Sequence, residues 1–399
     1  MPLPSSPSGS SRAVPDLPSH TRSGSSKIPP ELIQDLIPEI LVRIPPDDPA
    51  CLVRASLACE PWRRLLTNPG FLHRYRALHR TPPILGFLCN VNNVSGPAAR
   101  FVSTSSFRPA APDDRYYWHV LAAAHGRVLF HTITYNKCLV VWDPVTDQQW
   151  WVPTPVLPLL TTDYFHAAVF CAHASAGCNH LDCHGGPFRV AFVAINELGY
   201  TFARLYSSET GEWSEQIQIE EQVVIDRQPT ILLGNSVYFA CNAAVMPGIL
   251  EYNMAKGELS LIEPPLLHRN QMGTILIRTE AGMLGFAGIH ESRLHLWSRE
   301  VDPHGIVAWA PHKAIELKTL LLARPKITPH VLGFAEGVGI IFVRLNSGVF
   351  SIELKSGNTK KVPYPGRICE LRLGKTLKLF PYTCFCTPDR CNMKISTAC

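Results

Sequence analysis

Cysteine and histidine side chains gather in one short stretch of the chain, and this stretch is the strongest candidate for metal chemistry. The candidate ligands are Cys171, His173, Cys178, His180, Cys183 and His184. Thiolate and imidazole are ligands that zinc prefers in proteins. The spacings match no standard zinc finger, in which two ligand pairs are separated by about a dozen residues. We therefore interpret the stretch as a loop insertion with incidental cysteines. The six residues remain weak metal-site candidates, and we expect no bound metal or cofactor.

A second group of thiols lies near the end of the chain, at Cys384, Cys386, Cys391 and Cys399. It contains no second pair of the Cys-x-x-Cys type, so a metal site is not favoured. The chain has 13 cysteines, an odd number, and no recognisable secretory signal. These features predict reduced thiols in an intracellular protein, in the cytoplasm, the nucleus or both.

No stretch of the sequence predicts a catalytic centre. Gly333, Gly337 and Gly339 lie close together, but no Lys-Ser or Lys-Thr pair follows them, so a hairpin turn is favoured over a phosphate loop. The adjacent Glu220 and Glu221 point different ways on any regular element and make a poor acid/base pair. We therefore expect no enzymatic activity. A propeller enzyme with a helical cap is the alternative.

Composition excludes several other classes of protein. With 399 residues, 46% of them hydrophobic, and 17% charged residues, the chain is globular and long enough for one large domain and a small one. The formal charge of +5 is too small and too scattered to predict nucleic-acid binding. No apolar run approaches the roughly 18 residues that span a bilayer, so no membrane association is expected. Residues 1–27 are rich in serine and proline, which is typical of a disordered tail.

Residues 28–80 have a helical pattern. Apolar residues recur on one stripe at Leu32, Leu36, Ile37, Ile40, Leu41 and Ile44. Pro45 and Pro46 end this helix, Asp48 begins a second, and Trp62 lies in a third that ends near Asn68. Three short helices enclose only a very small core, so the apolar surplus must pack on a partner or on the rest of the chain.

From residue 81 the pattern becomes that of short strands separated by turn residues, which predicts an all-β domain over 81–375 followed by a cysteine-containing tail at 376–399. One turn recurs: an aromatic or apolar residue is followed five positions later by Gly or Asp. The pairs are Trp142 and Asp147, Tyr206 and Gly211, Tyr252 and Gly257, Trp297 and Asp302, and Ile352 and Gly357. A unit of about 45 residues is the size of a propeller blade. Together with the strands of Ile84–Ser106 and a closing strand near Leu371, this predicts six blades, with an insertion at 171–187; a pair of β-sandwiches is the alternative.

The helical segment resembles the F-box family. The resemblance rests on four stretches: Leu36–Pro45, Leu52–Cys59, Pro61–Arg63 and Asn68–Leu72. Two positions depart from the family pattern, since Pro38 lies inside the first helix and Glu60 replaces a lysine. The resemblance implies binding to a Skp-type adaptor, which bridges to a cullin. The residues expected at this interface are Leu36, Ile37, Ile40, Leu41, Ile44, Pro45, Leu52, Leu57 and Trp62.

The β domain is similar to the Kelch-like and F-box-associated propellers of plant F-box proteins. The join His79–Phe87 and the turn Asp143–Asp147 carry this similarity. It implies a mainly β fold, in which a small N-terminal α domain precedes a six-bladed propeller that binds a target protein. The implied function is the substrate-recognition subunit of a Skp-cullin-F-box ubiquitin ligase. An F-box protein that acts outside ubiquitin ligases is a further alternative.

Overall fold

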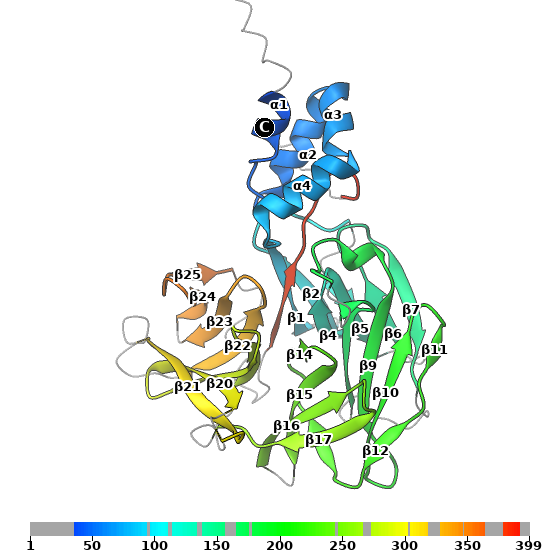
Figure 1. Ribbon diagram of the computed structural model, residues 1–399, viewed down its shortest axis with the longest axis vertical. Coiled ribbons are helices and arrows are strands. Elements are labelled where there is room, and N and C mark those ends of the chain that lie inside the picture. Colours follow the sequence, from blue (N-terminus) through cyan, green and yellow to red (C-terminus); the bar gives the residue numbers. More distant parts are fainter. Residues whose placement is uncertain are drawn as a thin grey trace, which may run out of the picture.

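The protein is a six-bladed β-propeller with a small helical unit at one end (Figure 1). The computed structural model describes residues 36–93, 96–110, 114–133, 138–155, 165–174, 178–243, 246–265, 273–301, 304–317, 328–345, 347–363 and 378–391. The tail expected at 1–27 and Cys399 lie outside these residues. Among the described residues, no helix has both the length and the apolar character needed to cross a membrane.

The helical unit holds one helix more than the sequence predicted. Its helices are α1 (Leu36–Leu41), α2 (Pro49–Ala58), α3 (Glu60–Leu66) and α4 (Pro69–His79). The extra helix is α4, which begins where the third was expected to end: the side chain of Asn68 accepts hydrogen bonds from the backbone N–H groups of Gly70 and Phe71. An N-cap of this kind starts a new helix. Pro38 lies in the first turn of α1, where proline costs little.

The propeller consists of six antiparallel sheets, each of which forms one blade. Blade one contains β26 (Leu379–Thr383), β1 (Ile84–Asn93), β2 (Gly96–Ser103) and β3 (Asp114–Tyr116). Blade two contains β4 (Trp118–Ala124), β5 (Arg127–Thr132), β6 (Cys138–Trp142) and β7 (Gln149–Pro153). Blade three contains β8 (Phe165–Cys171), β9 (Phe188–Ile195), β10 (Thr201–Ser207), β11 (Glu212–Trp213) and β12 (Ile217–Ile219). Blade four contains β13 (Val223–Ile225), β14 (Ile231–Leu233), β15 (Ser236–Ala243), β16 (Met246–Asn253) and β17 (Glu258–Ile262).

The last two sheets complete the ring. Blade five contains β18 (Ile275–Arg278), β19 (Leu284–His290), β20 (Arg293–Val301) and β21 (Val307–Glu316). Blade six contains β22 (His330–Ala335), β23 (Ile340–Leu345), β24 (Gly348–Glu353) and β25 (Thr359–Val362). The predicted propeller is therefore confirmed, and the alternative of two β-sandwiches is wrong.

A C-terminal strand closes the ring. β26 pairs with β1, so the first blade combines strands from both ends of the chain. β26 also packs between β22 and β4, the innermost strands of the two neighbouring blades. The strand that closes the ring is therefore Leu379–Thr383, while Leu371, where a closing strand was expected, and the expected boundary at residue 375 lie outside the described residues.

The predicted turn repeat is confirmed at four of its five positions. Asp147, Gly211, Gly257 and Gly357 all have positive φ angles. Each donates its backbone N–H to the carbonyl four residues earlier, with N–O distances of 2.8 or 2.9 Å. At the fifth position the turn residue, Asp302, lies outside the described residues, and Trp297 lies in the middle of β20 and not at a strand end. The feature that recurs is a turn residue with a positive φ angle, and not the aromatic residue before it. Trp297 alone was therefore a misleading marker of the repeat.

The predicted insertion is the connection between β8 and β9. Cys171 and Phe188 are register partners at the end of this hairpin, and the backbone N–H of Ala172 donates to the carbonyl of Pro187 at 3.0 Å. The connection ends in a short 3-10 helix, η2 (Cys183–Gly185). It therefore leaves the innermost strand of blade three and returns to the same blade, so its length does not disturb the ring.

Candidate functional site

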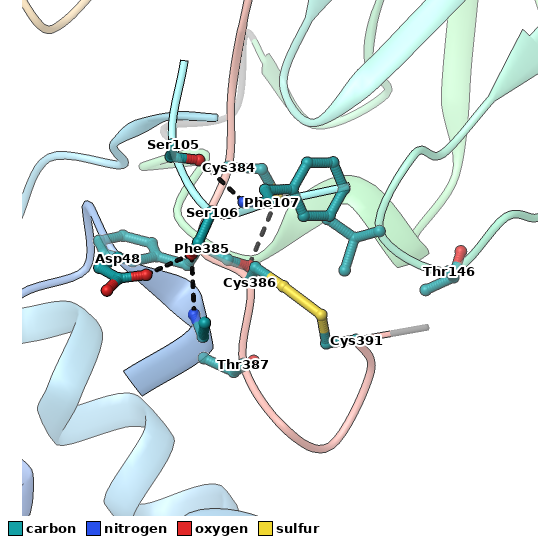
Figure 2. The surroundings of a disulfide bond; sticks show 12 residues. Asp48, Ser105, Ser106, Phe107, Thr146, Cys384, Phe385, Cys386, Thr387 and Cys391 are labelled. Atoms are coloured by element: carbon teal, nitrogen blue, oxygen red, sulfur yellow. Dashed lines mark hydrogen bonds between the residues drawn. A yellow bond between two sulfur atoms is a disulfide. The ribbon is translucent and has the colours of Figure 1, made fainter. Parts of the chain in front are cut away.

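The helical unit and the propeller meet at a polar contact at the start of α2. Asp48 precedes α2 and accepts a hydrogen bond from the hydroxyl of Ser106, which follows β2 (Figure 2). The backbone N–H of Ala50 donates to the same hydroxyl at 3.2 Å. The Ser106 hydrogen bond is the main cause of a lowered pKa of the Asp48 carboxyl. Ser106 thus ties the first turn of α2 to the first blade.

Residues from outside the helices complete the helical core. Phe385 follows the closing strand β26 and lies buried among Leu41, Leu66 and Tyr75. Its ring meets that of Tyr75 edge-on, with centroids 6.0 Å apart. Leu181, from the insertion, packs against the same cluster. The chain after β26 thus runs alongside α4, as the red segment in Figure 1 shows, and supplies part of the core that four short helices cannot.

An ion-pair network joins three segments at this junction. The guanidinium of Arg76, on α4, lies 3.0 Å from the carboxylate of Asp182 in the insertion. Asp182 also pairs with Arg390, near the C-terminus, at 3.0 Å. Arg76 is almost completely buried, and its Nη2 lies 3.5 Å from the hydroxyl of Thr387. Partly buried pairs are screened less than exposed ones, so this network helps to fix α4 on the propeller.

The structure divides the nine expected interface residues into two groups. Leu36, Ile40 and Leu57 are large apolar side chains with exposed fractions of 47%, 50% and 67%. Pro45 is exposed as well, while Ile37, Ile44 and Trp62 are partly buried against the helical core.

Leu41 and Leu52 form a second group, because only 3% and 1% of these residues is exposed. Assigning them to the surface was wrong: they fill the core of the helical unit. Helical periodicity finds the apolar stripe but does not tell which of its members a neighbouring helix covers.

The exposed apolar residues lie on α1 and at the end of α2. α1 and α3 form the end of the helical unit that points away from the blades (Figure 1). Glu60, which departs from the family pattern, pairs with Arg63 and Arg64 on its own helix at 2.6 and 2.9 Å. Those hydrogen bonds lower the pKa of the Glu60 carboxyl, so the side chain is engaged within α3.

Four of the six candidate ligands come together in the insertion. They are Cys171, Cys178, His180 and Cys183, which we call the four-ligand cluster, and their ligand atoms all lie within 4.8 Å of one another. The remaining two do not join it. His173 is exposed, and His184 is buried with its Nδ1 at 2.8 Å from the carboxylate of Asp143.

Basic side chains from blade two surround the cluster. His125 follows β4, its ring stacks on that of His180 with centroids 3.7 Å apart, and its Nδ1 accepts the backbone N–H of Cys171 at 3.1 Å. Burial, and secondarily the neighbouring His180, lower the pKa of His125 to about 3, so this imidazole is neutral at pH 7. Arg127 is fully buried and donates from Nη2 to the carbonyl of Cys183 at 2.7 Å.

The C-terminal thiols differ from the prediction. Cys386 and Cys391 form a disulfide (Figure 2), so the expectation of reduced thiols throughout is wrong for this pair. Cys384 is buried in the core between the first two blades, and burial raises the pKa of its thiol to about 12. These cysteines act in packing and cross-linking and do not gather into a ligand set.

The glycine-rich stretch forms a turn, as predicted. Gly337 and Gly339 both have positive φ angles and connect β22 to β23, whereas Gly333 lies within β22 itself. The backbone N–H of Gly339 donates to the carbonyl of Ala335. The stretch therefore serves as a hairpin turn.

Comparisons with known proteins bear only on the fold. No family model and no curated protein matches this chain. Among solved structures, TolB from Acinetobacter baumannii is 12% identical, with a TM-score of 0.38 over 71% of this chain and 65% of TolB, just under two thirds of its length. The β-propeller domain of Cps50 (Swd1) from Myceliophteria thermophila is 8% identical, with a TM-score of 0.36 over 71% of this chain and 84% of that one.

The lectin SapL1, in complex with alpha methyl fucoside, is 9% identical and has a TM-score of 0.40 over 72% of this chain and 99% of the lectin. Identities and TM-scores this low carry no information about function. The six-bladed ring itself rests on the strand pairing of this chain.

Several residues at the junction carried no signal in the sequence. Arg76, Asp182 and Phe385 are distant along the chain and belong to no recognisable motif. His125 and Arg127 flank the turn between β4 and β5, and nothing in their spacing points to the insertion. Only the ring topology, which places the ends of β4, β8 and β26 beside one another, brings them to one place.

Proposed function

We propose that this chain is the target-recognition subunit of a ubiquitin ligase of the Skp-cullin-F-box type. The helical unit binds a Skp-type adaptor, and the propeller binds a target protein. One observation carries the proposal. The segment whose sequence resembles an F-box forms a helical unit at one end of the molecule (Figure 1), and this unit leaves Leu36, Ile40 and Leu57 exposed.

The physical case starts from these exposed side chains. Large apolar side chains that stay exposed on one short unit gain free energy when a partner covers them. A groove between partner helices accepts such a face through a few anchoring side chains. Ile40 and Leu57 are the best anchors on this unit because, unlike Leu41 and Leu52, they are not needed for its own core.

In this role the chain supplies no reacting group. It holds a target lysine close to the conjugating enzyme that carries ubiquitin, and the resulting rise in effective concentration accelerates transfer. The contacts of Ser106, Phe385 and Asp182 with the helical unit support this role, because a fixed join between adaptor and target keeps that distance constant.

The test is co-purification of the full chain with a Skp-type adaptor. Wild type is compared with the double variant Ile40→Ala, Leu57→Ala. We expect wild type to elute with the adaptor at about one to one. Truncation of two interface anchors is expected to weaken the affinity at least about 30-fold, in line with interface hot spots.

The matched control is Leu198→Ala. Leu198 is as exposed as Leu57 but lies in the propeller, between β9 and β10. The Leu198→Ala variant should bind the adaptor with the same affinity as wild type. If wild type does not bind, or if all three proteins bind equally, the proposed interface is wrong. Addition of a cullin separates the remaining alternative: an F-box protein that acts outside ubiquitin ligases binds the adaptor without recruiting the cullin.

A further inference from the structure

The four-ligand cluster has the composition and the dimensions of a metal site. We propose that Cys171, Cys178, His180 and Cys183 together bind one zinc ion. Three sulfurs and one imidazole are a ligand set that tetrahedral zinc sites use, and their ligand atoms already lie within 4.8 Å of one another. The spacing along the chain resembles no standard finger, but the fold supplies the proximity that the spacing does not.

The one ligand-to-ligand distance that can be compared with ideal geometry fits well. Nδ1 of His180 lies 3.6 Å from Sγ of Cys183. Zinc bonds of about 2.3 Å to sulfur and about 2.05 Å to nitrogen, at a tetrahedral angle, place these two atoms about 3.6 Å apart. A shared ion therefore accommodates this pair without movement of either residue.

The buried guanidinium of Arg127 balances the net negative charge that such a site would have. One zinc ion with three thiolates has a net charge of about −1. Arg127 lies fully buried beside the cluster, bonded through Nη2 to the carbonyl of Cys183, while its Nε and Nη1 have no hydrogen-bond partner. A buried cation without full compensation is costly unless an anionic group lies close by. The carboxylate of Asp143 is one anionic neighbour of Arg127, and a zinc–thiolate centre supplies a second.

Hydrogen bonds and ring stacking also position the ligands. The backbone N–H of His180 points at Sγ of Cys178, 3.4 Å away. The ring of His125 stacks in parallel on His180, and its Nδ1 accepts the backbone N–H of Cys171. His125 thus contacts two ligands without being one, which is how partners outside the metal's own ligands orient such sites.

All four ligands come from the protein, so the site is closed and its role is structural. Its position shows what it stabilises. Leu181 and Asp182 lie between two of the ligands, His180 and Cys183, and both contact the helical unit: Leu181 packs on its core and Asp182 pairs with Arg76 on α4. Zinc at this point fixes the segment of the insertion that holds α4 on the propeller.

The first test is the metal content of the purified full chain, measured by elemental analysis after preparation with a reductant and without chelators. We expect about one zinc per chain in wild type. The double variant Cys178→Ser, Cys183→Ser should retain less than about 0.2. His173→Gln is the matched control: it removes a histidine of the same loop that lies outside the cluster, and it should keep its zinc.

Two results overturn the zinc site. One is less than about 0.2 zinc per chain in folded wild type, or another metal in its place. The other is an unchanged zinc content in the double variant. Cobalt substitution of wild type gives an independent readout that does not depend on a variant folding. A tetrahedral thiolate spectrum is expected, and an octahedral one contradicts the assigned ligands.

The structural role is tested by hydrogen exchange of wild type before and after removal of the metal by a chelator. Exchange should rise in residues 178–186 and in α4, and stay unchanged in β20 and β21 of blade five, which lie outside the junction. Loss of zinc with no change in α4 contradicts the link to the helical unit. This result is independent of adaptor binding, so it separates the metal site from the proposed function.

Discussion

The propeller and the helical unit are stabilised in different ways. The propeller builds its core from its own strands: clusters of buried residues lie between successive blades, and β26 closes the ring. The helical unit has a single small cluster, which it completes with Phe385 and Leu181 from elsewhere in the chain. If the helical unit separated from the propeller, it would lose the contacts of Phe385 and Leu181 and would become less stable. The join between the two parts is therefore a structural element in its own right.

The same comparison explains where an interaction surface can arise. Since part of the helical core comes from outside, the helices need not turn every apolar residue inward. Leu36, Ile40 and Leu57 remain exposed on them. In the helical unit, the buried apolar residues therefore serve packing, and the exposed ones are available for recognition of a partner.

Removing Phe385 is expected to have the largest effect on this arrangement. Phe385→Ala deletes a buried aromatic side chain that contacts Tyr75 and should destabilise the helical unit by about 3–5 kcal/mol. Hydrogen exchange of α4 measures it. Phe342→Ala, an equally buried phenylalanine of β23, should instead raise exchange in blade six. If Phe385→Ala leaves α4 protected, the helical unit does not depend on this segment.

Leucine truncations in the helical unit should separate its core from its surface. Leu41→Ala removes a buried side chain and should cost about 2–5 kcal/mol of unfolding free energy. Leu57→Ala removes an exposed one and should change it by less than about 0.5 kcal/mol. Thermal unfolding measures both. Equal losses would mean that Leu57 belongs to a core and is not available to a partner.

The ion pair at the junction should have an intermediate effect. Asp182→Asn leaves the guanidinium of Arg76 buried without its carboxylate and should cost about 1–3 kcal/mol. Glu316→Gln is a suitable control, because Glu316 pairs with Arg293 at the surface and such pairs contribute about 0–1 kcal/mol. Chemical denaturation measures the two variants. A smaller loss for Asp182→Asn than for the control would contradict the role of the network.

The smallest expected effect is a pH dependence at Asp48. The Ser106 hydroxyl lowers the pKa of this carboxyl, so the carboxylate form favours the folded state. The contribution is therefore present at neutral pH and is lost as the pH falls below about 4, where the group takes up a proton. The protection factor at the start of α2, which is the exchange rate corrected for the intrinsic rate at each pH, should fall more steeply from pH 7 to pH 3 in wild type than in Asp48→Asn. Parallel curves would show that Asp48 does not contribute.

The sequence predicted the parts that depend on local pattern. Turn residues with positive φ angles, such as Gly211 and Gly257, marked the blades because few other residues adopt that conformation. Asn68 was read as the end of a helix, although its side chain begins the next one. Local pattern did not reveal Leu41 and Leu52 as core residues, nor the meeting of Cys171 with His180. The burial of Leu41 and Leu52 depends on contacts with distant segments such as Phe385, and Cys171 and His180 meet where the distant His125 contacts both of them.

The most direct test of the account is hydrogen exchange of the full chain with and without a Skp-type adaptor. The account predicts new protection in α1 and at the end of α2, around Ile40 and Leu57, and none in the six blades. Protection in the blades, with the helices unchanged, would contradict it, because the helical unit would then not be the adaptor-binding surface.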